Sequence, residues 1–241
     1  MGERPEETAG VKNIYLIKRR PTATREELIV HWFANHMPDV IARHKNNRGS
    51  IFAKHYVATF FDVKAGRDLA WDGMAQLWYN QATPHPDRPM GSDPVDTFQE
   101  KAEPYMPWAT KEYVVMNGPL PLAPPTLNRP FPCTRSGFFK VVFLVGLVAG
   151  ADSQALFDHW LGKHVANVRR VMEKVDGFRY VVSHALDPDV EDYAGMAELY
   201  FPDASGWARY REEIKPDGIE QWVDPDNVAV YTSRTEMVGI P

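Results

Sequence analysis

The chain contains the same short pattern twice, and this repeat constrains its fold more than any other feature. LIVHWFANH begins at Leu28 and LFDHWLGKH begins at Leu156, so His-Trp-x-x-x-His recurs with an offset of 128 residues. A second block, GMAQL at Gly73 against GMAEL at Gly195, recurs in the same order with an offset of 122. Two matched blocks in one order favour a duplicated module over coincidence.

A proline-rich stretch separates the two copies. Residues 118–136 contain six prolines in nineteen positions. Proline fixes its own φ and donates no N–H, so this stretch is typical of a stiff, extended linker. The sequence therefore predicts a first module at residues 11–117 and a second at 137–238. Cys133, the single cysteine, falls in the linker, where an unpaired thiol is expected, and excludes both an internal disulfide and a multi-thiolate metal site.

Each module shows the same order of predicted elements: strand, helix, two strands, short helix, strand. The predicted segments are 14–18, 24–37, 51–59, 74–79, 95–102 and 112–116 in the first module, and 138–147, 152–175, 178–185, 196–201, 205–213 and 228–232 in the second. This βαββαβ order is ferredoxin-like, with an antiparallel four-stranded sheet and both helices on one face. We predict an α+β fold of two such modules whose sheets cover each other as a barrel or sandwich.

Composition argues against several classes of protein. The formal charge is −5 and the isoelectric point is near 5.9, whereas nucleic-acid binding requires a basic face. The longest apolar run, residues 141–149, is the length of a strand, so no membrane span is expected. The polar N-terminus and the lone cysteine favour a cytoplasmic location.

The repeated motif places a histidine on an apolar helix face. Residues four apart share a face, so His36 follows Leu28 and Trp32, and His164 follows Leu156 and Trp160. Burying an unpaired imidazole costs roughly 1–3 kcal/mol. Two interpretations remain open: a core histidine bonded to a carbonyl, or an acid, base or donor that lines a cavity.

The other motif histidines, His31 and His159, precede these by five residues. On a regular helix they point about 140° away, so each pair cannot aim at one point, which disfavours a zinc site. Solvent exposure or packing between helices accounts for His31 and His159 as well as contact with a ligand does. Pro38 predicts that the first helix ends or kinks directly after His36.

Strand alternation and acidic spacing add further candidates. Tyr180 and His184 share an apolar face of one predicted strand, whereas His55 shares a face with Ala53 on another strand and Tyr56 lies on the opposite face. Ordinary core packing explains each as well as catalysis does. Aromatic side chains that could line a pocket are Trp32, Trp160, Tyr56, Tyr180, Tyr15, Trp78, Tyr79 and Tyr200. The acidic residues of 93–103, which include Asp96, are expected on a solvated helix face.

The run YLIKRRPTATREELIVHWFANHMPDVI resembles the signature of EthD-type proteins, which belong to the dimeric α+β barrel superfamily. The matching residues are His31, Trp32, His36 and Pro38 in the first copy and His159, Trp160 and His164 in the second, where Ala166 replaces the proline. The resemblance implies ferredoxin-like modules with sheets packed face to face. Single-module relatives achieve this packing as homodimers. A tandem chain can achieve it internally, and a further homodimer is left open.

The resemblance also implies a range of chemistries, because fold alone does not fix the reaction. The superfamily includes polyketide cyclases, muconolactone isomerases, cofactor-free quinone-forming monooxygenases and the haem-binding chlorite dismutase group. Some EthD-like proteins are similar to fungal pigment decarboxylases or dehydratases. Our leading hypothesis is an enzyme without cofactor or metal that moves protons on a small aromatic or polyketide-like compound.

Particular residues carry this hypothesis. His36 or His164 is the expected acid/base, and His184 and His55 are further candidates. Expected substrate contacts are Trp32, Trp160, His31, His159, Tyr56, Tyr180 and Trp78. The alternatives are a non-catalytic accessory protein that binds a small molecule, and a haem-binding protein or cofactor-free oxygenase.

Overall fold

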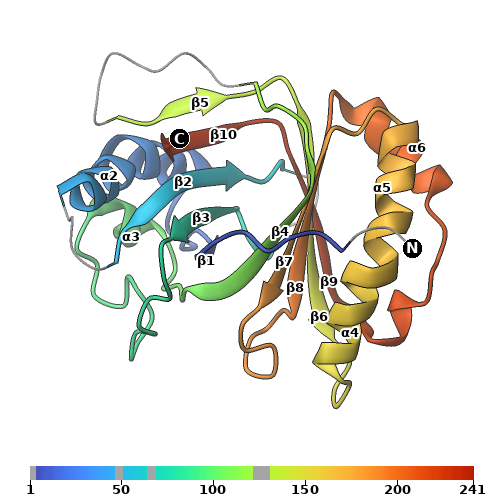
Figure 1. The fold of residues 1–241 in the computed structure, drawn as a ribbon. Helices are drawn as coiled ribbons and strands as arrows, with labels where there is room; N and C mark the ends of the chain where they lie inside the picture. The colour runs from blue at the N-terminus through green and yellow to red at the C-terminus, as the bar shows by residue number, and fades with distance from the viewer. Residues whose placement is uncertain (1–3, 47–50, 64–68, 122–130) are drawn as a thin grey trace. The chain divides into compact units, whose positions relative to one another are not determined.

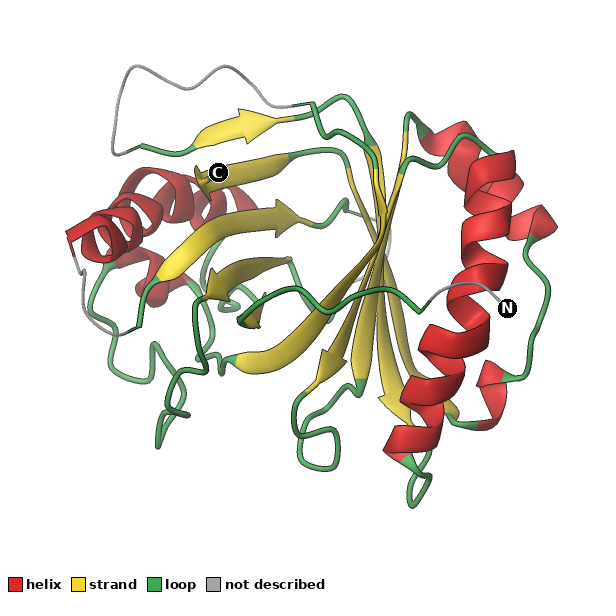
Figure 2. Ribbon diagram, viewed as in Figure 1, coloured by secondary structure: helices red, strands yellow, loops and turns green. Residues whose placement is uncertain are grey.

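A computed structural model describes residues 4–46, 51–63, 69–121 and 131–241 (Figures 1 and 2). The chain divides into two compact units. The first unit comprises Gly10–Ala109 with Leu122–Ser136 and Thr235–Pro241. The second unit comprises Gly137–Arg234 with Met1–Ala9 and Thr110–Pro121.

The first unit is an antiparallel sheet in the order β5-β10-β2-β3-β1, with its helices on one face (Figure 1). Its elements are β1 (Val11–Ile17), α1 (Arg25–His31), η1 (Trp32–His36), α2 (Met37–Asn46), β2 (Ala53–Phe60), β3 (Gly73–Tyr79), α3 (Thr97–Lys101), β5 (Cys133–Arg135) and β10 (Glu236–Ile240). The predicted capping box is present, because Thr24 accepts from the Glu27 N–H and Glu27 accepts from the Thr24 N–H.

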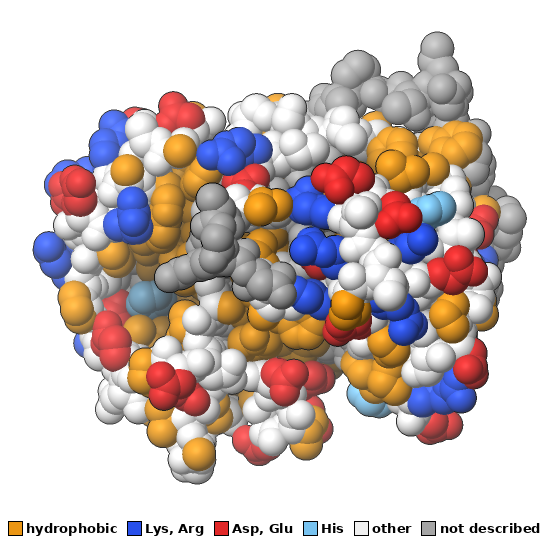
Figure 3. All heavy atoms as spheres, turned by 180° about the vertical axis from the view of Figure 1, so that it is seen from behind, with side chains coloured by type: hydrophobic (Ala, Val, Ile, Leu, Met, Phe, Trp, Pro, Cys, Tyr) orange, Lys and Arg blue, Asp and Glu red, His pale blue; other side chains and the backbone are white. Residues whose placement is uncertain are grey.

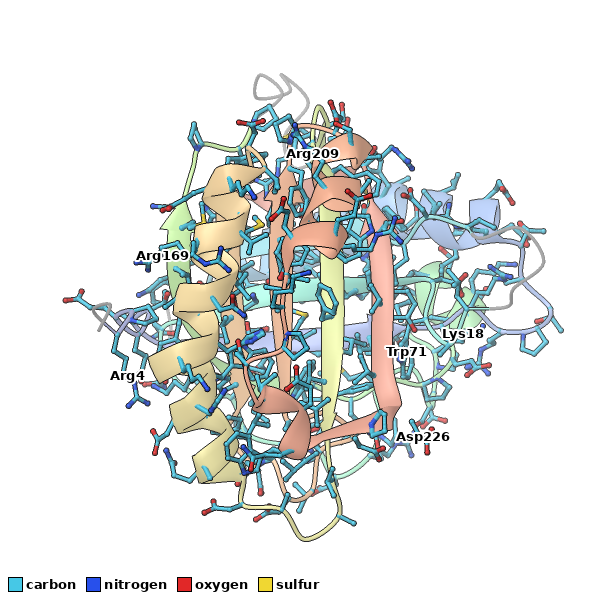
Figure 4. The ribbon with its side chains drawn as sticks, turned by 90° about the vertical axis from the view of Figure 1, so that its right-hand side faces the viewer. Arg4, Lys18, Trp71, Arg169, Arg209 and Asp226 are labelled. Atoms are coloured by element: carbon cyan, nitrogen blue, oxygen red, sulfur yellow. The ribbon has the colours of Figure 1, made fainter. Side chains whose placement is uncertain are left out.

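The second unit is an antiparallel sheet in the order β4-β7-β8-β6-β9. Its elements are β4 (Trp108–Asn117), β6 (Phe139–Leu147), α4 (Ser153–His159), η2 (Trp160–His164), α5 (Val165–Lys174), β7 (Arg179–Ala185), β8 (Gly195–Phe201), α6 (Ala204–Glu213), η3 (Ile219–Gln221) and β9 (Val223–Ser233). Figure 4 looks onto the helix layer of this sheet. Arg169 of α5 donates to the Val115 carbonyl of β4 at 3.1 Å and ties the layers together.

The predicted α+β class and the antiparallel ferredoxin-like order are therefore confirmed. Strands β9-β6-β8-β7 follow the order expected of one βαββαβ module, and β1, β2 and β3 pair equivalently in the first unit. Each unit packs its helices onto one sheet face around a cluster of buried apolar residues, centred on Trp160 in the second unit and on Trp32 in the first.

Each long helix contains a π-helical turn that the sequence analysis did not predict. The Met37 N–H bonds to the Trp32 carbonyl, and the Val165 N–H bonds to the Trp160 carbonyl, five residues back in both cases. The prediction that the helix ends directly after His36 was wrong, because it continues as α2 to Asn46. A kink at this point stays a prediction. Pro38 directly follows the π turn in this continuous helix, and the helix lacks one N–H donor at that position.

The linker and β2 also differ from the prediction. Cys133–Arg135 forms strand β5 against β10, so part of the expected linker belongs to a sheet, while residues 122–130 lie outside the described residues.

A bulge between Ala53 and His55 shifts the register of β2. The shift places buried Ala53 on the core face with Tyr56 and leaves His55 exposed on the other face.

Surface and helix lengths add two observations. Acidic and basic side chains are interspersed over the face shown in Figure 3, in keeping with 27 basic and 32 acidic residues. Within the described ranges, every helix is too short or too polar to cross a membrane.

Candidate functional site

In both units the motif tryptophan is fixed to the sheet by a hydrogen bond to a tyrosine. Trp32 Nε1 donates to the Tyr56 hydroxyl at 3.0 Å, and Trp160 Nε1 donates to the Tyr180 hydroxyl at 3.4 Å. All four side chains are almost fully buried. The indole N–H is thereby satisfied in the core, and the helix is held at a fixed position over the sheet.

In the first unit, His36 pairs with an aspartate of a short helix. His36 Nδ1 lies 2.6 Å from Asp96 Oδ2, and only 13% and 11% of the two side chains are exposed. Asp96 is the N-cap of α3 and accepts from the Gln99 N–H at 2.9 Å. The ring of Phe98 lies against the imidazole, with centroids 4.5 Å apart. The carboxylate is thus held by the helix start and cannot swing away from His36.

The electrostatics of this dyad favour a carboxylate. Burial raises the pKa of Asp96, but the hydrogen bonds from His36 and from the Gln99 N–H outweigh burial, so this pKa lies below its ordinary value. An ionised Asp96 accepts a hydrogen bond from the N–H at His36 Nδ1, which leaves Nε2 as the second functional nitrogen. The prediction of a solvated Asp96 was therefore wrong, because the side chain turns toward the helix bearing His36.

A cavity of about 340 Å³ lies beside this dyad, between α2 and the sheet of the first unit. Such a volume is at the small end of the range for small-molecule sites. Aromatic, apolar and a few polar side chains line it: Tyr15, Ile17, Trp32, His36, Val40, Arg43, His44, Tyr56, Ala75, Leu77, Tyr79, Met90, Phe98, Gln99 and Tyr105. Of the predicted candidates, the cavity brings together His36, Trp32 and Tyr56, with Tyr15 and Tyr79.

Four tyrosines of the cavity are buried phenols. Burial raises the pKa of Tyr15, Tyr56 and Tyr79, and it raises the pKa of Tyr105 to about 12. Their hydroxyls are therefore neutral at pH 7 and can donate hydrogen bonds. The Tyr56 oxygen already accepts from Trp32, which leaves its own O–H as a donor.

In the second unit, two histidines converge on one aspartate. Asp217 Oδ1 lies 3.1 Å from His159 Nε2, and Asp217 Oδ2 lies 2.7 Å from His164 Nδ1 and 2.8 Å from Asn167 Nδ2. Burial raises the pKa of Asp217, but the hydrogen bonds from His164 and Asn167 dominate and hold it well below its ordinary value. The expectation that the paired histidines cannot aim at one point was wrong here, because the π turn stacks residues five apart.

The second unit fills the space that is hollow in the first. Phe143 of β6 pairs with Ala197 of β8, and Tyr15 of β1 pairs with Ala75 of β3 in the same register. Phe143 therefore occupies the position in the second unit that the cavity residue Tyr15 occupies in the first. Helix α6 then packs Trp207 onto Phe143, with ring centroids 5.8 Å apart. The part of the first unit that corresponds to α6, residues 80–96, consists of loop, turns and an isolated bridge. The first unit is therefore the better candidate for a ligand site.

The remaining predicted residues lie elsewhere. His184 is buried and stacks on Phe157, with centroids 4.1 Å apart, in the core of the second unit. His55 is exposed and contacts Trp78 on the sheet face opposite Tyr56. His31 is half-buried, and its Nδ1 lies 3.5 Å from Asn35 Nδ2. None of these lines the first-unit cavity.

The sequence analysis missed Asp96, Arg43 and His44 as site residues. Asp96 had a usable signal, because an N-cap aspartate followed three residues later by Gln99 marks a helix start. Arg43 and His44 fall seven and eight residues after His36, a spacing that returns to the same helix face. The predicted helix end hid that relation. Among the described residues, no cluster of three or more His, Cys, Asp or Glu side chains could hold a metal ion.

Comparisons with known proteins agree with this fold. Residues 149–226 match the EthD domain family, which places the match in the second copy of the repeat. The chain is similar to the solved structure of an anthrone oxidase-like protein, with TM-score 0.54, 10% identity and coverage of 96% of this chain and 94% of that chain. It is also similar to TA0507, provisionally named a chlorite dismutase, with TM-score 0.52, 8% identity and coverage of 93% and 94%. No curated protein matches the sequence.

Proposed function

We propose that this EthD-type protein, whose fold is that of the dimeric α+β barrel proteins, is an enzyme that moves protons on a small aromatic or polyketide-like compound. The compound would bind in the first-unit cavity. One observation carries the proposal: a carboxylate-anchored histidine, His36 with Asp96, forms part of the wall of a tyrosine-lined cavity.

His36 is the proposed general base. With its Nδ1 proton directed to Asp96, its Nε2 presents a lone pair, and the carboxylate stabilises the imidazolium that forms when Nε2 takes a proton. Such a group contributes on the order of 10²–10⁴-fold in rate. Asp96 is a positioning residue, since it acts through His36.

The cavity tyrosines are proposed to bind the substrate oxygen. A proton removed from carbon beside a carbonyl leaves an enolate, whose negative charge develops on oxygen. Tyr56 offers a neutral O–H held in place by Trp32, and Tyr105 offers a second. Preorganised donors in a site shielded from water stabilise such charge effectively.

The same enolate leads to several products with balanced steps. Return of the proton at another carbon is an isomerisation, and loss of a β-hydroxyl with that proton is a dehydration. Attack of the enolate carbon on a second carbonyl forms the C–C bond of a cyclisation, and the resulting alkoxide takes the proton back from the His36 imidazolium. Loss of carbon dioxide from the carboxylate of a β-keto acid leaves an enolate, which takes its proton from a His36 that has been protonated by solvent before the step. All four need only the acid/base residues described.

Haem does not fit this cavity as the side chains lie. A volume of about 340 Å³ suits a compound of two or three fused rings, and a porphyrin with two propionates is larger. We therefore derive no step through haem. A colourless purified protein that gains no Soret band on titration with hemin is the expected result.

Proton exchange on a probe tests the proposal without knowledge of the natural substrate. The probe is 1,8-dihydroxyanthrone, whose C10 protons are acidic because they lie opposite a carbonyl in the central ring. Loss of the C10–H signal in D₂O is followed by NMR under nitrogen. We expect the protein to accelerate exchange, and His36→Gln to lower the accelerated rate by about 10²-fold or more.

The second copy supplies a matched control. His164→Gln removes the equivalent imidazole of the second unit and should leave the exchange rate unchanged. Exchange that persists in folded His36→Gln refutes the assignment of the base. Binding of the probe without acceleration of exchange supports the non-catalytic alternative. Oxygen uptake in air that depends on His36 supports the cofactor-free oxygenase.

A further inference from the structure

The cavity has a second polar end, formed by Arg43 and His44 of α2. Both side chains line the cavity together with His36 and Val40. Arg43 follows His36 by two helical turns, which places their Cα atoms about 10 Å apart along the axis. Val40 lies between them on the same helix face. The helix wall therefore presents an apolar strip with a functional group at each end.

His44 is fixed as a neutral hydrogen-bond donor. Its Nδ1 accepts the backbone N–H of Ala53 at 3.2 Å, so that nitrogen carries no proton. The proton of the neutral ring is then on Nε2, the tautomer opposite to that assigned to His36. Burial, with a smaller effect from the charge of Arg43, lowers the pKa of His44 and keeps this form at neutral pH. One imidazole of the cavity thus offers a lone pair and the other an N–H.

Arg43 adds a positive charge beside His44 at the exposed edge of the cavity. Its Nε bonds to the backbone carbonyl of Asp39 at 3.4 Å. Within the part of the chain that the structure describes, no carboxylate forms an ion pair with it. The remaining guanidinium donors form the planar fork that matches a carboxylate.

We propose that Arg43 and His44 form an anion subsite, and that the cavity selects aromatic compounds that carry a carboxylate. The carboxylate binds the guanidinium and the His44 Nε2–H, and the ring lies along Val40. The opposite end of the ring then faces His36. The role of that end as the reacting end rests on the proposed function, whereas the preference for an anion does not.

A pair of probes of equal shape tests the subsite. We would measure binding of 6-hydroxy-2-naphthoate and of 6-hydroxy-2-naphthamide by isothermal titration calorimetry at pH 7. The wild type should bind the carboxylate about tenfold more tightly than the amide, as expected for charge-assisted hydrogen bonds. Arg43→Gln should weaken binding of the carboxylate about tenfold and binding of the amide by much less, so that the preference is lost, and Arg43→Lys should restore part of the preference.

Controls separate this subsite from a general charge effect. Arg170→Gln removes an exposed guanidinium of the second unit and should leave the preference intact. Equal affinities of the wild type for both probes overturn the proposal, as does binding of neither, or an equal loss for both in Arg43→Gln. A carboxylate preference in a protein whose proton exchange ignores His36→Gln would sink the proposed function and leave the subsite standing.

Discussion

Replacing His184 with phenylalanine should make the protein less sensitive to acid. Burial, with a smaller effect from the charge of Arg4, lowers the pKa of His184 to about 3. The unfolded chain has the ordinary value of about 6.5 and therefore binds a proton that the folded protein excludes. The stability linked to this side chain is fully present above pH 6.5 and is lost progressively as the pH falls toward 3.

The structure sets the size of this effect. Each pH unit between those two values costs about 1.4 kcal/mol, so the wild type should lose about 2 kcal/mol from His184 between pH 6.5 and pH 5. Phenylalanine suits the site, because the ring stacks on Phe157 with an interplanar angle of 11°. It also removes the buried Nε2, for which the described residues provide no hydrogen-bond partner. We expect a further gain of about 1 kcal/mol at pH 7.

Urea unfolding of the wild type and His184→Phe at pH 7 and pH 5, followed by tryptophan fluorescence, measures this difference. His55→Gln removes an exposed imidazole and serves as the control, with no expected change in pH dependence. The reasoning is refuted if the wild type and His184→Phe lose equal stability between the two pH values, since that result would mean a hydrated or protonated His184 in the folded state.

Three further predictions concern the packing of the motif. Asp217→Asn should lower the free energy of unfolding by about 2–3 kcal/mol at pH 7. This deficit should shrink as the pH falls below about 4, because the unfolded wild-type chain then takes up a proton at Asp217 that the folded protein, in which the pKa of Asp217 is depressed, excludes. Urea titrations at pH 7 and pH 3 measure the deficit, and an equal deficit at both pH values contradicts the prediction. Gly195→Ala places a Cβ 2.9 Å from Trp160 Cζ3, so a lower melting temperature is expected, and an unchanged one would disprove the tight packing. Tyr56→Phe leaves the Trp32 Nε1 buried without its acceptor and should cost about 1–3 kcal/mol. Adding Trp32→Phe should cost less than it does in the wild type, and strict additivity in this double-mutant cycle argues against the bond.

Much of the fold could be predicted because the repeat and the strand patterns are local. The two blocks at Gly73 and Gly195 lie in equivalent strands, and the order of elements followed from apolar runs and one capping box. Strands β5 and β10 were missed, since their pairing joins residues about a hundred positions apart and leaves little local signal. The cytoplasmic location and a homodimer stay predictions.

The site was less predictable, because its key contacts join distant segments. His36 was identified from its place on an apolar helix face, but its partner Asp96 is sixty residues away in an acidic stretch that is typical of a solvated surface. The choice of unit depends on side-chain volume: the second unit packs Trp207 where the first has space. Neither copy of the motif carries that information itself.

The π turn accommodates one extra residue between Trp32 and Met37. It brings residues five apart onto one face, as an ordinary α-helix does for residues four apart, so removing one residue from the turn would leave Arg43 and the other later side chains close to their present faces. The change would fall on the turn itself, where His36 would shift relative to Asp96. The turn is therefore the place where the histidine can be moved against its carboxylate while the rest of the helix keeps its register.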